Sequence, residues 1–485
     1  MRAYNELNKQ YINGKWVDGG EDIVIENSDP FSGAVIHTLP SAGKKEVNDA
    51  FDAATEAAKT WAVSNPLYRR GLLLKAAELL LQRKDEFVDW LTKEVGSTYI
   101  KSIIEIQQVH DVLVEASSFP TRMHGLTLQS TTEDKETYVY RKPLGVIGLI
   151  SPWNFPLYLS MRTIAPALGT GNTMVVKPSA SSLVTGGTLI AKLFEEAGVP
   201  AGVFNVVVGS SDAIGDYFTQ HAGARMISFT GSTAVGKHIG KITGEALKRS
   251  MLELGGNNAY IVLEDADIDK AVAAAIFGKF LHQGQLCISI NRILVHQNIL
   301  EAFKDKFIER TKLLTVGDPA EKSTVIGPVI DNKSLSRITD IIQRSVEMGA
   351  IVETGNKVEG NILYPTVLTG VTAAMPIFQN EIFGPAVGLV AFRDDDEAIQ
   401  LANATSYGLS GGVYTRDIYR GMKLARKVES GMIHVNDQTA NDEVHTPFGG
   451  EKASGMGRFG GDFIMNELTT VQWVSVQGQA RQYPF

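Results

Sequence analysis

The chain has 485 residues, of which 44% are hydrophobic and 21% charged, so we expect two or three domains of a globular protein. Its formal net charge of −8, with no run of like charge, argues against nucleic acid or an anionic membrane as the main partner. No apolar stretch approaches the roughly 20 residues of a membrane span. A single cysteine and the lack of an export signal lead us to expect a cytoplasmic protein.

The first hundred residues have the pattern of a β-hairpin followed by helices. Asn13-Gly14 separates two short apolar runs, and this pair tolerates the positive φ of a two-residue turn. Apolar residues then recur at helical spacing over residues 44–63 and again over 67–95, which predicts two helices.

Short apolar runs alternate with helical segments through the middle of the chain. Buried strands are predicted at residues 145–150, 173–177, 205–208 and 226–229. This alternation is typical of βαβ units and predicts a parallel sheet with helices on both faces. A second series starts near Gly255, with strands at 260–263 and 293–295 around a helix at 267–282.

Cys287 is the single cysteine and lies in the glycine-flanked stretch Gly284-Gln285-Leu286-Cys287. It can form neither an intrachain disulfide nor a multi-cysteine metal site, and no metal is expected. It is therefore a buried apolar filler or a nucleophile. Taken alone the filler is favoured by roughly two to one, but the neighbouring motifs favour a nucleophile, whose surroundings should promote the thiolate.

Two polar residues could assist such a thiol. Asn154, in Ser151-Pro152-Trp153-Asn154-Phe155-Pro156, directly follows a predicted strand and could stabilise an oxyanion. Alternatively, at about even odds, it caps the next helix. Glu253 ends a short strand before two glycines and could act as a general base, although an isolated glutamate is more often a solvated loop acid.

The segment Gly231-Ser232-Thr233-Ala234-Val235-Gly236 follows a strand and opens a helix, where free N–H groups attract phosphate. A tight turn without a ligand is equally expected from one glycine pair. With Lys237 the segment also fits the Gly-x-x-x-x-Gly-Lys of a nucleotide hydrolase. His238 replaces the magnesium-binding Ser or Thr, so this alternative has a weight of about one in twenty.

Seven blocks between Ser151 and Gly457 resemble the aldehyde dehydrogenase superfamily, and most of all its benzaldehyde and vanillin dehydrogenases. One block would be weak evidence, whereas seven in the expected order are specific. The blocks are Pro152-Trp153-Asn154-Phe155-Pro156, Lys177-Pro178-Ser179, Phe229-Thr230-Gly231-Ser232-Thr233-Ala234-Val235-Gly236, Glu253-Leu254-Gly255-Gly256-Asn257, Gly284-Gln285-Leu286-Cys287, Glu381-Ile382-Phe383-Gly384-Pro385 and Pro447-Phe448-Gly449-Gly450-Glu451-Lys452-Ala453-Ser454-Gly455.

The resemblance implies a role for each matching residue. Cys287 would be the nucleophile, Glu253 the general base, and Asn154 with the Cys287 N–H the oxyanion hole. An aldehyde would pass through a thiohemiacetal and a thioester to the carboxylic acid. The cofactor, NAD or NADP, would be bound by Trp153, Lys177, Ser179, Gly231, Ser232, Gly236, Leu254, Glu381 and Phe383.

NAD-selective relatives often carry a glutamate three residues after the lysine that matches Lys177. Ala180 stands at that position here, with Ser181 and Ser182 beside it. Because the carboxylate that would repel a 2′-phosphate is absent, we expect NADP to be accepted as well as NAD.

The expected substrate is an aromatic aldehyde of the benzaldehyde or vanillin type. Aromatic walls suit a flat ring, and residues 434–443 also resemble a loop of aromatic aldehyde dehydrogenases. Core packing is the alternative for the aromatic residues, at about one in three. Arg162 leaves a semialdehyde open as substrate, and an aliphatic aldehyde is a further alternative. The residues at substrate positions are Phe155, Tyr158, Arg162, His445 and Phe448.

Two other functions are alternatives for this chain. An acylating relative would pass the thioester to coenzyme A, but Glu253, as a water-activating base, argues against it. A binding or structural protein without activity is disfavoured because nucleophile, base and oxyanion donor are all present.

The resemblance also implies an α/β fold with three parts. A Rossmann-like, parallel-sheet dinucleotide domain would comprise residues 1–118 and 138–254, and an α/β catalytic domain residues 255–450. Residues 119–137, which are polar and β-prone, and 451–485 would form a small β oligomerisation arm and tail. Such an arm exposes strand edges, so we expect a homodimer or homotetramer.

Overall fold

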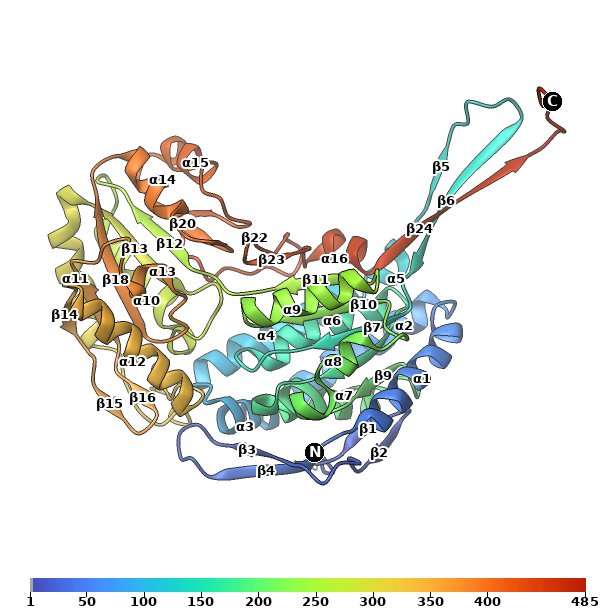
Figure 1. The fold of residues 1–485 in the computed structure, drawn as a ribbon, viewed down its shortest axis with the longest axis horizontal. Helices are drawn as coiled ribbons and strands as arrows, with labels where there is room; N and C mark the ends of the chain where they lie inside the picture. The colour runs from blue at the N-terminus through green and yellow to red at the C-terminus, as the bar shows by residue number, and fades with distance from the viewer. Residues whose placement is uncertain (1–2) are drawn as a thin grey trace.

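Two α/β lobes and a projecting β arm make up the computed structural model, which describes residues 3–485 (Figure 1). Each lobe is built on a largely parallel sheet, which confirms the α/β class predicted from the alternation of strands and helices. Within these residues, no helix is both long and apolar enough to cross a membrane.

The sheet of the first lobe has eight strands in the order β2-β1-β9-β8-β7-β10-β11-β23, parallel from β9 to β11. The chain order reverses between β7 and β10, and ligands of open α/β sheets bind at such a point, beyond the carboxyl ends of the strands. The strands are β1 (Gln10–Ile12), β2 (Lys15–Val17), β7 (Val146–Ile150), β8 (Thr173–Lys177), β9 (Phe204–Val206), β10 (Met226–Thr230), β11 (Arg249–Glu253) and β23 (Gly455–Met456).

Helices cover both faces of this sheet, as the alternation predicted. On one face lie α1 (Lys44–Trp61), α8 (Ser211–Gln220) and α9 (Thr233–Glu245), with a core that includes Phe51 and Phe218. On the other face lie α6 (Pro156–Gly169) and α7 (Leu189–Ala197), and α2, α3 and α4 pack outside them. The bounds of these outer helices are Pro66–Gln82, Lys84–Val95 and Tyr99–Ala116.

The single helix predicted over residues 67–95 is wrong, because the chain breaks it into α2 and α3 at Arg83 (φ −104°, ψ 14°). The Arg83 guanidinium lies 3.7 Å from the centre of the Tyr4 ring and pairs with Glu196 and Glu86. These tertiary contacts outweigh the helix propensity of the local sequence. The predicted hairpin is confirmed, with Asn13 and Gly14 both at positive φ between β1 and β2.

The sheet of the second lobe has seven strands in the order β14-β17-β18-β13-β12-β20-β21, parallel except for β14. Helices α10 and α11 cover one face, and α12 to α15 lie against the other. The strands are β12 (Asn258–Val262), β13 (Ile290–His296), β14 (Ile351–Thr354), β17 (Thr366–Thr369), β18 (Ala386–Phe392), β20 (Gly411–Tyr414) and β21 (His434–Val435). The helices are α10 (Ile268–Phe280), α11 (Leu300–Lys312), α12 (Asn332–Glu347), α13 (Pro376–Gln379), α14 (Asp395–Asn403) and α15 (Ile418–Ala425).

The arm is a three-stranded antiparallel sheet in the order β24-β6-β5, and it projects from the first lobe beside the C-terminus (Figure 1). β24 (Thr469–Gln477) pairs with β6 (Lys135–Pro143) from Thr469↔Pro143 to Gln477↔Lys135, so the expected pairing of the tail is confirmed. β5 (Leu126–Leu128) lies on the other side of β6. Phe119–Arg122 forms a short helix, α5, instead of a strand.

Short elements complete the chain. A hairpin of β3 (Val24–Ser28) and β4 (Val35–Pro40) precedes α1, and α16 (Gly461–Glu467) precedes β24. The remaining two-stranded sheets are β15 (Val358–Glu359) with β16 (Ile362–Leu363), and β19 (Tyr407–Gly408) with β22 (Glu451–Lys452).

Candidate active site

Cys287 lies in the segment that connects α10 to β13, after a left-handed turn. His282 (φ 49°), Gln283 (φ 55°) and Gly284 (φ 71°) end the helix two residues before its predicted end. The Gln283 side-chain amide donates to the carbonyls of Gly96 (3.1 Å) and Pro328 (3.0 Å). Non-glycine residues adopt this conformation only where their surroundings enforce it, so the turn that presents the thiol is fixed by contacts outside it.

The backbone of Cys287 is held from the strand that follows Glu253. The Asn258 side-chain amide donates to the Cys287 carbonyl over 2.7 Å. A Cβ on Gly256 would lie 2.1 Å from that same carbonyl oxygen. Glycine is therefore required at position 256, because the two segments could not otherwise approach each other.

Asn154 contacts the Cys287 segment instead of capping a helix. Its side-chain amide donates to the Gln285 carbonyl over 2.9 Å, and a second N–H of the same amide remains to donate to another group. The backbone N–H groups of Leu157 and Tyr158, at the start of α6, donate instead to the buried carboxylate of Glu105. The capping alternative for Asn154 is thus wrong.

Glu253 is a buried carboxyl group, not a solvated loop acid. It is the last residue of β11, its side chain is 1% exposed, and neither oxygen accepts a hydrogen bond from residues 3–485. Burial raises the pKa of Glu253 to about 8, although the charge of Arg162, 3.9 Å away, acts in the opposite direction. A pKa in this range suits a group that accepts a proton near neutral pH.

The surroundings of Cys287 do not favour the thiolate, contrary to the expectation from its sequence. Residue Cys287 is partly exposed, yet burial, and after it the nearby charge of Glu253, raises the pKa of the thiol to about 12. The thiol is therefore the resting form in the protein without ligand, and attack needs a group that takes the proton.

Four of the five predicted substrate residues line one cavity with Cys287 and Asn154. They are Phe155, Tyr158, Arg162 and Phe448. His445 is not brought to this cavity, since its side chain is 65% exposed and lies 3.5 Å from Glu443. Three aromatic side chains and one cation among the predicted residues thus line the cavity with the thiol.

A second set of predicted residues gathers beyond the carboxyl ends of β8 and β10. Lys177 lines a cavity between α8 and α9 together with Val235, and the first turn of α9 is capped by Ser232, whose hydroxyl accepts from Val235 N–H (3.4 Å). The Gly231 N–H donates to the Glu253 carbonyl. A Cβ on Gly236 would lie 2.2 Å from the Leu254 side chain, so this glycine lets α9 pack closely on the strand end.

Three further predicted residues lie outside the cavity beside Lys177. Glu381 accepts a hydrogen bond from Gly256 N–H, and burial raises its pKa to about 7. The rings of Trp153 and Phe383 meet edge to face, with centroids 5.5 Å apart. Ser179, by contrast, uses its hydroxyl to cap the short helix Ala180–Ser182. The cavity beside Lys177 and the start of α9 lie beyond the carboxyl ends of the strands, which is where open α/β sheets bind ligands.

Comparison with known proteins identifies the chain. The model of the aldehyde dehydrogenase family matches residues 16–474. The chain belongs to this family. A benzaldehyde dehydrogenase of Bacillus subtilis (strain 168) is 45% identical over 100% of both chains. A vanillin dehydrogenase of Corynebacterium glutamicum is 44% identical over 97% of this chain and 98% of its own.

Solved structures agree with the family assignment. A salicylaldehyde dehydrogenase from Pseudomonas putida G7, complexed with salicylaldehyde, superposes with a TM-score of 0.96 at 37% identity, over 98% of this chain and 99% of its own. The aldehyde dehydrogenase fold and the resemblance to benzaldehyde and vanillin dehydrogenases are therefore confirmed.

The nucleotide-hydrolase alternative is wrong for this aldehyde dehydrogenase. Only Gly231 and Ser232 separate β10 from α9, so no loop is present that could surround phosphates. Lys237 lies within α9 and is exposed, and His238 pairs with Asp216 over 2.9 Å.

Sequence reasoning missed Asp442, a carboxyl group in the wall of the substrate cavity. It accepts a hydrogen bond from the Tyr158 hydroxyl (2.7 Å) and lies 3.4 Å from the Arg162 guanidinium. Burial raises the pKa of Asp442, and the charge of Arg162 lowers it. The resemblance covers residues 434–443 as a whole, and no periodic pattern in this loop indicates which acid is buried.

Proposed function

We propose that this protein oxidises an aromatic aldehyde, of the benzaldehyde or vanillin type, to the carboxylic acid with NAD or NADP. One observation carries this proposal. The Cys287 thiol and Asn154 line a cavity walled by Phe155, Tyr158 and Phe448, and the buried Glu253 carboxyl lies 3.9 Å from Arg162, which lines the same cavity. Names of the relatives, which include benzaldehyde and vanillin dehydrogenases, support the substrate class.

In the proposed reaction the Cys287 thiol releases its proton to solvent, and its sulfur attacks the aldehyde carbon. The Asn154 amide and the Cys287 N–H donate to the oxygen that becomes negative. The bound nicotinamide cofactor supplies the hydride acceptor. Glu253 then takes a proton from the water that attacks the resulting thioester, which releases the acid and restores the thiol.

The cofactor is proposed to lie across the first lobe. Lys177 and Ser179 would meet the adenosine ribose, while Gly231, Ser232 and Gly236 at the start of α9 would border the pyrophosphate, with Leu254 packed beneath. Glu381 would hold the nicotinamide ribose, and Trp153 and Phe383 would lie near the ring. These positions are supported by the cavity beside Lys177 and by the free N–H groups at the helix start.

Relaxed cofactor choice belongs to the same proposal. No carboxylate follows Lys177 at position 180, and Lys44, at the start of α1, also lines the cavity. Lys44→Ala should therefore weaken binding of 2′,5′-ADP more than that of 5′-AMP, as measured by calorimetry. Lys45→Ala is the matched control, because Lys45 pairs with Asp49 and does not line the cavity. Equal losses for the two nucleotides would count against a 2′-phosphate contact.

An aromatic substrate is favoured over a semialdehyde by the state of Arg162. Among the described residues that line the cavity it is the one cation, and Asp442 and Glu253 already face its guanidinium. It is therefore not available for a substrate carboxylate. Betaine aldehyde is cationic and would need an unpaired anion. The Asp442 carboxylate forms an ion pair with Arg162, so the residues that line the cavity offer none.

The substrate proposal is tested by comparing kcat/KM for benzaldehyde, vanillin, hexanal, betaine aldehyde and succinic semialdehyde, following reduced nicotinamide by absorbance. We expect kcat/KM to be highest for the two aromatic aldehydes. An aliphatic or carboxylated aldehyde that exceeds both by more than about tenfold (some 1.4 kcal/mol) would overturn the aromatic assignment and leave the family unchanged.

The remaining proposals concern organisation. We propose a dinucleotide domain of residues 1–118 and 138–254, a catalytic domain of 255–450, and an arm and tail of 119–137 and 451–485. A homodimer or homotetramer is supported by the exposed apolar residues of the arm, such as Leu126, Val471 and Trp473. A cytoplasmic location rests on the single cysteine of the sequence.

A further inference from the structure

Arg162 is a buried cation for which the proposed reaction has no direct use. Its side chain is 4% exposed and lies between the rings of Phe448 and Phe459, whose centroids are 4.2 and 4.0 Å from the guanidinium carbon. Asp442 holds one end of the guanidinium, with 3.4 Å between Arg162 Nη1 and Asp442 Oδ2. Because two rings and a carboxylate hold this guanidinium in place, it cannot move to contact a ligand.

The other end of the guanidinium faces Glu253, with 3.9 Å between Arg162 Nη2 and Glu253 Oε2. A buried carboxylate needs a partner, and among residues 3–485 neither Glu253 oxygen has a hydrogen bond. The other charged groups that act on it are Arg458, which follows β23, and Asp442. The Cys287 thiol lies within electrostatic reach from the second lobe.

We propose that Arg162 is a positioning residue for Glu253: its guanidinium favours the ionised form of the general base, and Asp442 with the two rings holds it in place. The inference rests on the proposed role of Glu253 but not on the identity of the aldehyde. An opposite charge at this distance favours the ionised form, and a like charge disfavours it. Arg162 lowers the pKa of Glu253, whereas Asp442 raises it.

The two neighbours of Glu253 therefore predict opposite effects. Arg162→Met removes the favourable charge, so Glu253 should ionise only at higher pH. Asp442→Asn keeps the shape and removes an unfavourable charge, so Glu253 should ionise at lower pH. A role in packing alone would give no such reversal of sign, because both substitutions would then disturb the same wall.

The experiment reads deacylation of Cys287 without cofactor or aldehyde. 4-Nitrophenyl acetate transfers its acetyl group to the Cys287 sulfur, 4-nitrophenolate leaves, and the thiol proton passes to solvent. Water then attacks the thioester, which gives acetate and restores the thiol. Loss of acetyl-Cys287 is followed by intact-protein mass across pH 5.5 to 10, and the pH at which the rate reaches half its maximum is compared among variants.

We expect Arg162→Met to move this midpoint upward by about one pH unit, which slows deacylation about tenfold below it. Arg162→Lys keeps the positive charge, so its midpoint should lie close to that of the unmodified protein. Asp442→Asn should move the midpoint downward. Glu443→Gln, which removes an acid of the same loop whose side chain is 69% exposed, is the control and should leave the midpoint in place.

Midpoints that stay put in Arg162→Met and Asp442→Asn, or that move in the same direction, would overturn the proposal. If Arg162→Met does not fold, the Asp442→Asn midpoint decides alone, and only a downward shift supports the inference. Failure of the aromatic-aldehyde proposal would appear separately, in the panel of substrates with the unmodified protein.

Discussion

Cys287 carries the covalent step in the proposed reaction, and no second cysteine can replace it. Cys287→Ala should therefore abolish aldehyde oxidation, whereas binding of NAD should persist, because the cavity between α8 and α9 lies apart from the thiol. The measurement is absorbance of reduced nicotinamide together with calorimetric binding of NAD. Appreciable oxidation by this variant would remove Cys287 from the mechanism.

Glu253 is expected to act after the thioester has formed. Glu253→Gln should accumulate acyl-Cys287 and slow its hydrolysis by about 10²–10⁴-fold, the usual contribution of one general base. Since the pKa of Glu253 is raised to about 8, hydrolysis in the unmodified protein should speed up as pH rises through that value. Rapid mixing with benzaldehyde and NAD, followed by mass analysis, measures both.

The control for this variant is Glu443→Gln, an acid near the same cavity whose side chain is 69% exposed. It should hydrolyse the acyl-enzyme at the original rate. Steady-state turnover in Glu253→Gln equal to that of the unmodified protein would exclude Glu253 as the base.

Sequence patterns could predict the site residues that belong to a motif. They could not predict residues whose role depends on being buried in the folded protein. Cys287, Asn154 and Glu253 lie in blocks whose spacing is specific, and the structure brings them together. Asp442 lies in a loop without periodicity, where nothing distinguishes a buried acid from an exposed one. The high pKa of Cys287 also could not be predicted, because it depends on packing from both lobes.

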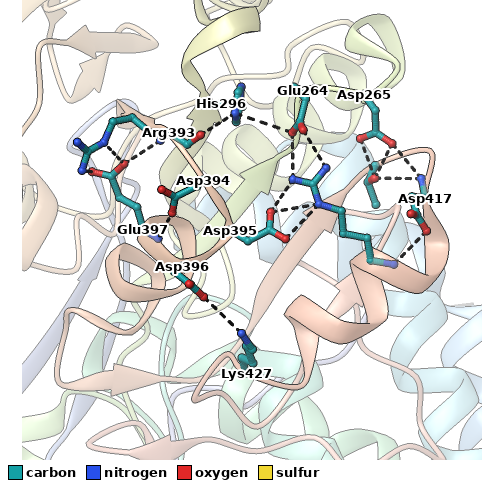
Figure 2. A network of polar contacts seen from close by, with 12 residues as sticks. Glu264, Asp265, His296, Arg393, Asp394, Asp395, Asp396, Glu397, Asp417 and Lys427 are labelled. Carbon is teal, nitrogen blue, oxygen red and sulfur yellow. Dashed lines mark hydrogen bonds and ion pairs between the residues drawn. The ribbon is translucent and has the colours of Figure 1, made fainter.

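At the scale of the element, a network of charged groups joins the helices at one end of the second lobe (Figure 2). The Arg420 guanidinium, from α15, pairs with Glu264, which follows β12, over 3.0 Å and with Asp395, which begins α14, over 2.6 Å. The Glu264 and Asp395 carboxylates, both labelled in Figure 2, each accept hydrogen bonds from the Arg420 guanidinium. One side chain thus links a strand end and two helices.

Arg420→Met should lower the free energy of unfolding by about 1 kcal/mol, because the bonds are charge-assisted but the groups are partly exposed. Lys427→Met is the matched control, since its 3.5 Å contact with Asp396 is largely exposed and should contribute little. Urea unfolding at pH 7 measures both. Equal stability of the two variants would contradict a role for the network.

The same network gives a pH dependence with a defined sign. The Arg420 hydrogen bond holds the pKa of Glu264 below its usual value, so the unfolded chain binds this proton more readily than the folded one. The stabilisation is complete above the ordinary glutamate pKa and is lost as pH falls through the lowered one. The difference between Arg420→Met and the unmodified protein should shrink accordingly below about pH 4.5.

Elements were predictable where their periodicity is strong, and boundaries failed where distant contacts decide them. The strands β7, β8 and β10 follow their apolar runs closely. The break at Arg83 depends on Tyr4 and Glu196, which are far away in sequence. The early end of α10 depends on Gly96 and Pro328, which hold the Gln283 side chain. Local sequence contains none of this information.

At the scale of the whole molecule, the arm is the part that a single chain leaves incomplete. β24 and β5 are its edge strands, and they expose unpaired backbone groups beside large apolar side chains. Trp473 is 67% exposed and Val471 63% exposed on β24. A second copy of the chain would cover both the edge and these side chains, which is the physical basis for the proposed oligomer.

Trp473→Glu should therefore shift the protein toward a smaller assembly, because a charge would have to be buried at the contact. The measurement is molar mass by light scattering across a dilution series. Tyr419→Glu is the matched control, since Tyr419 is an aromatic residue 89% exposed on α15, away from the arm, and should leave the mass unchanged. A monomeric unmodified protein, or an oligomer whose mass Trp473→Glu does not alter, would show that the arm is not the contact.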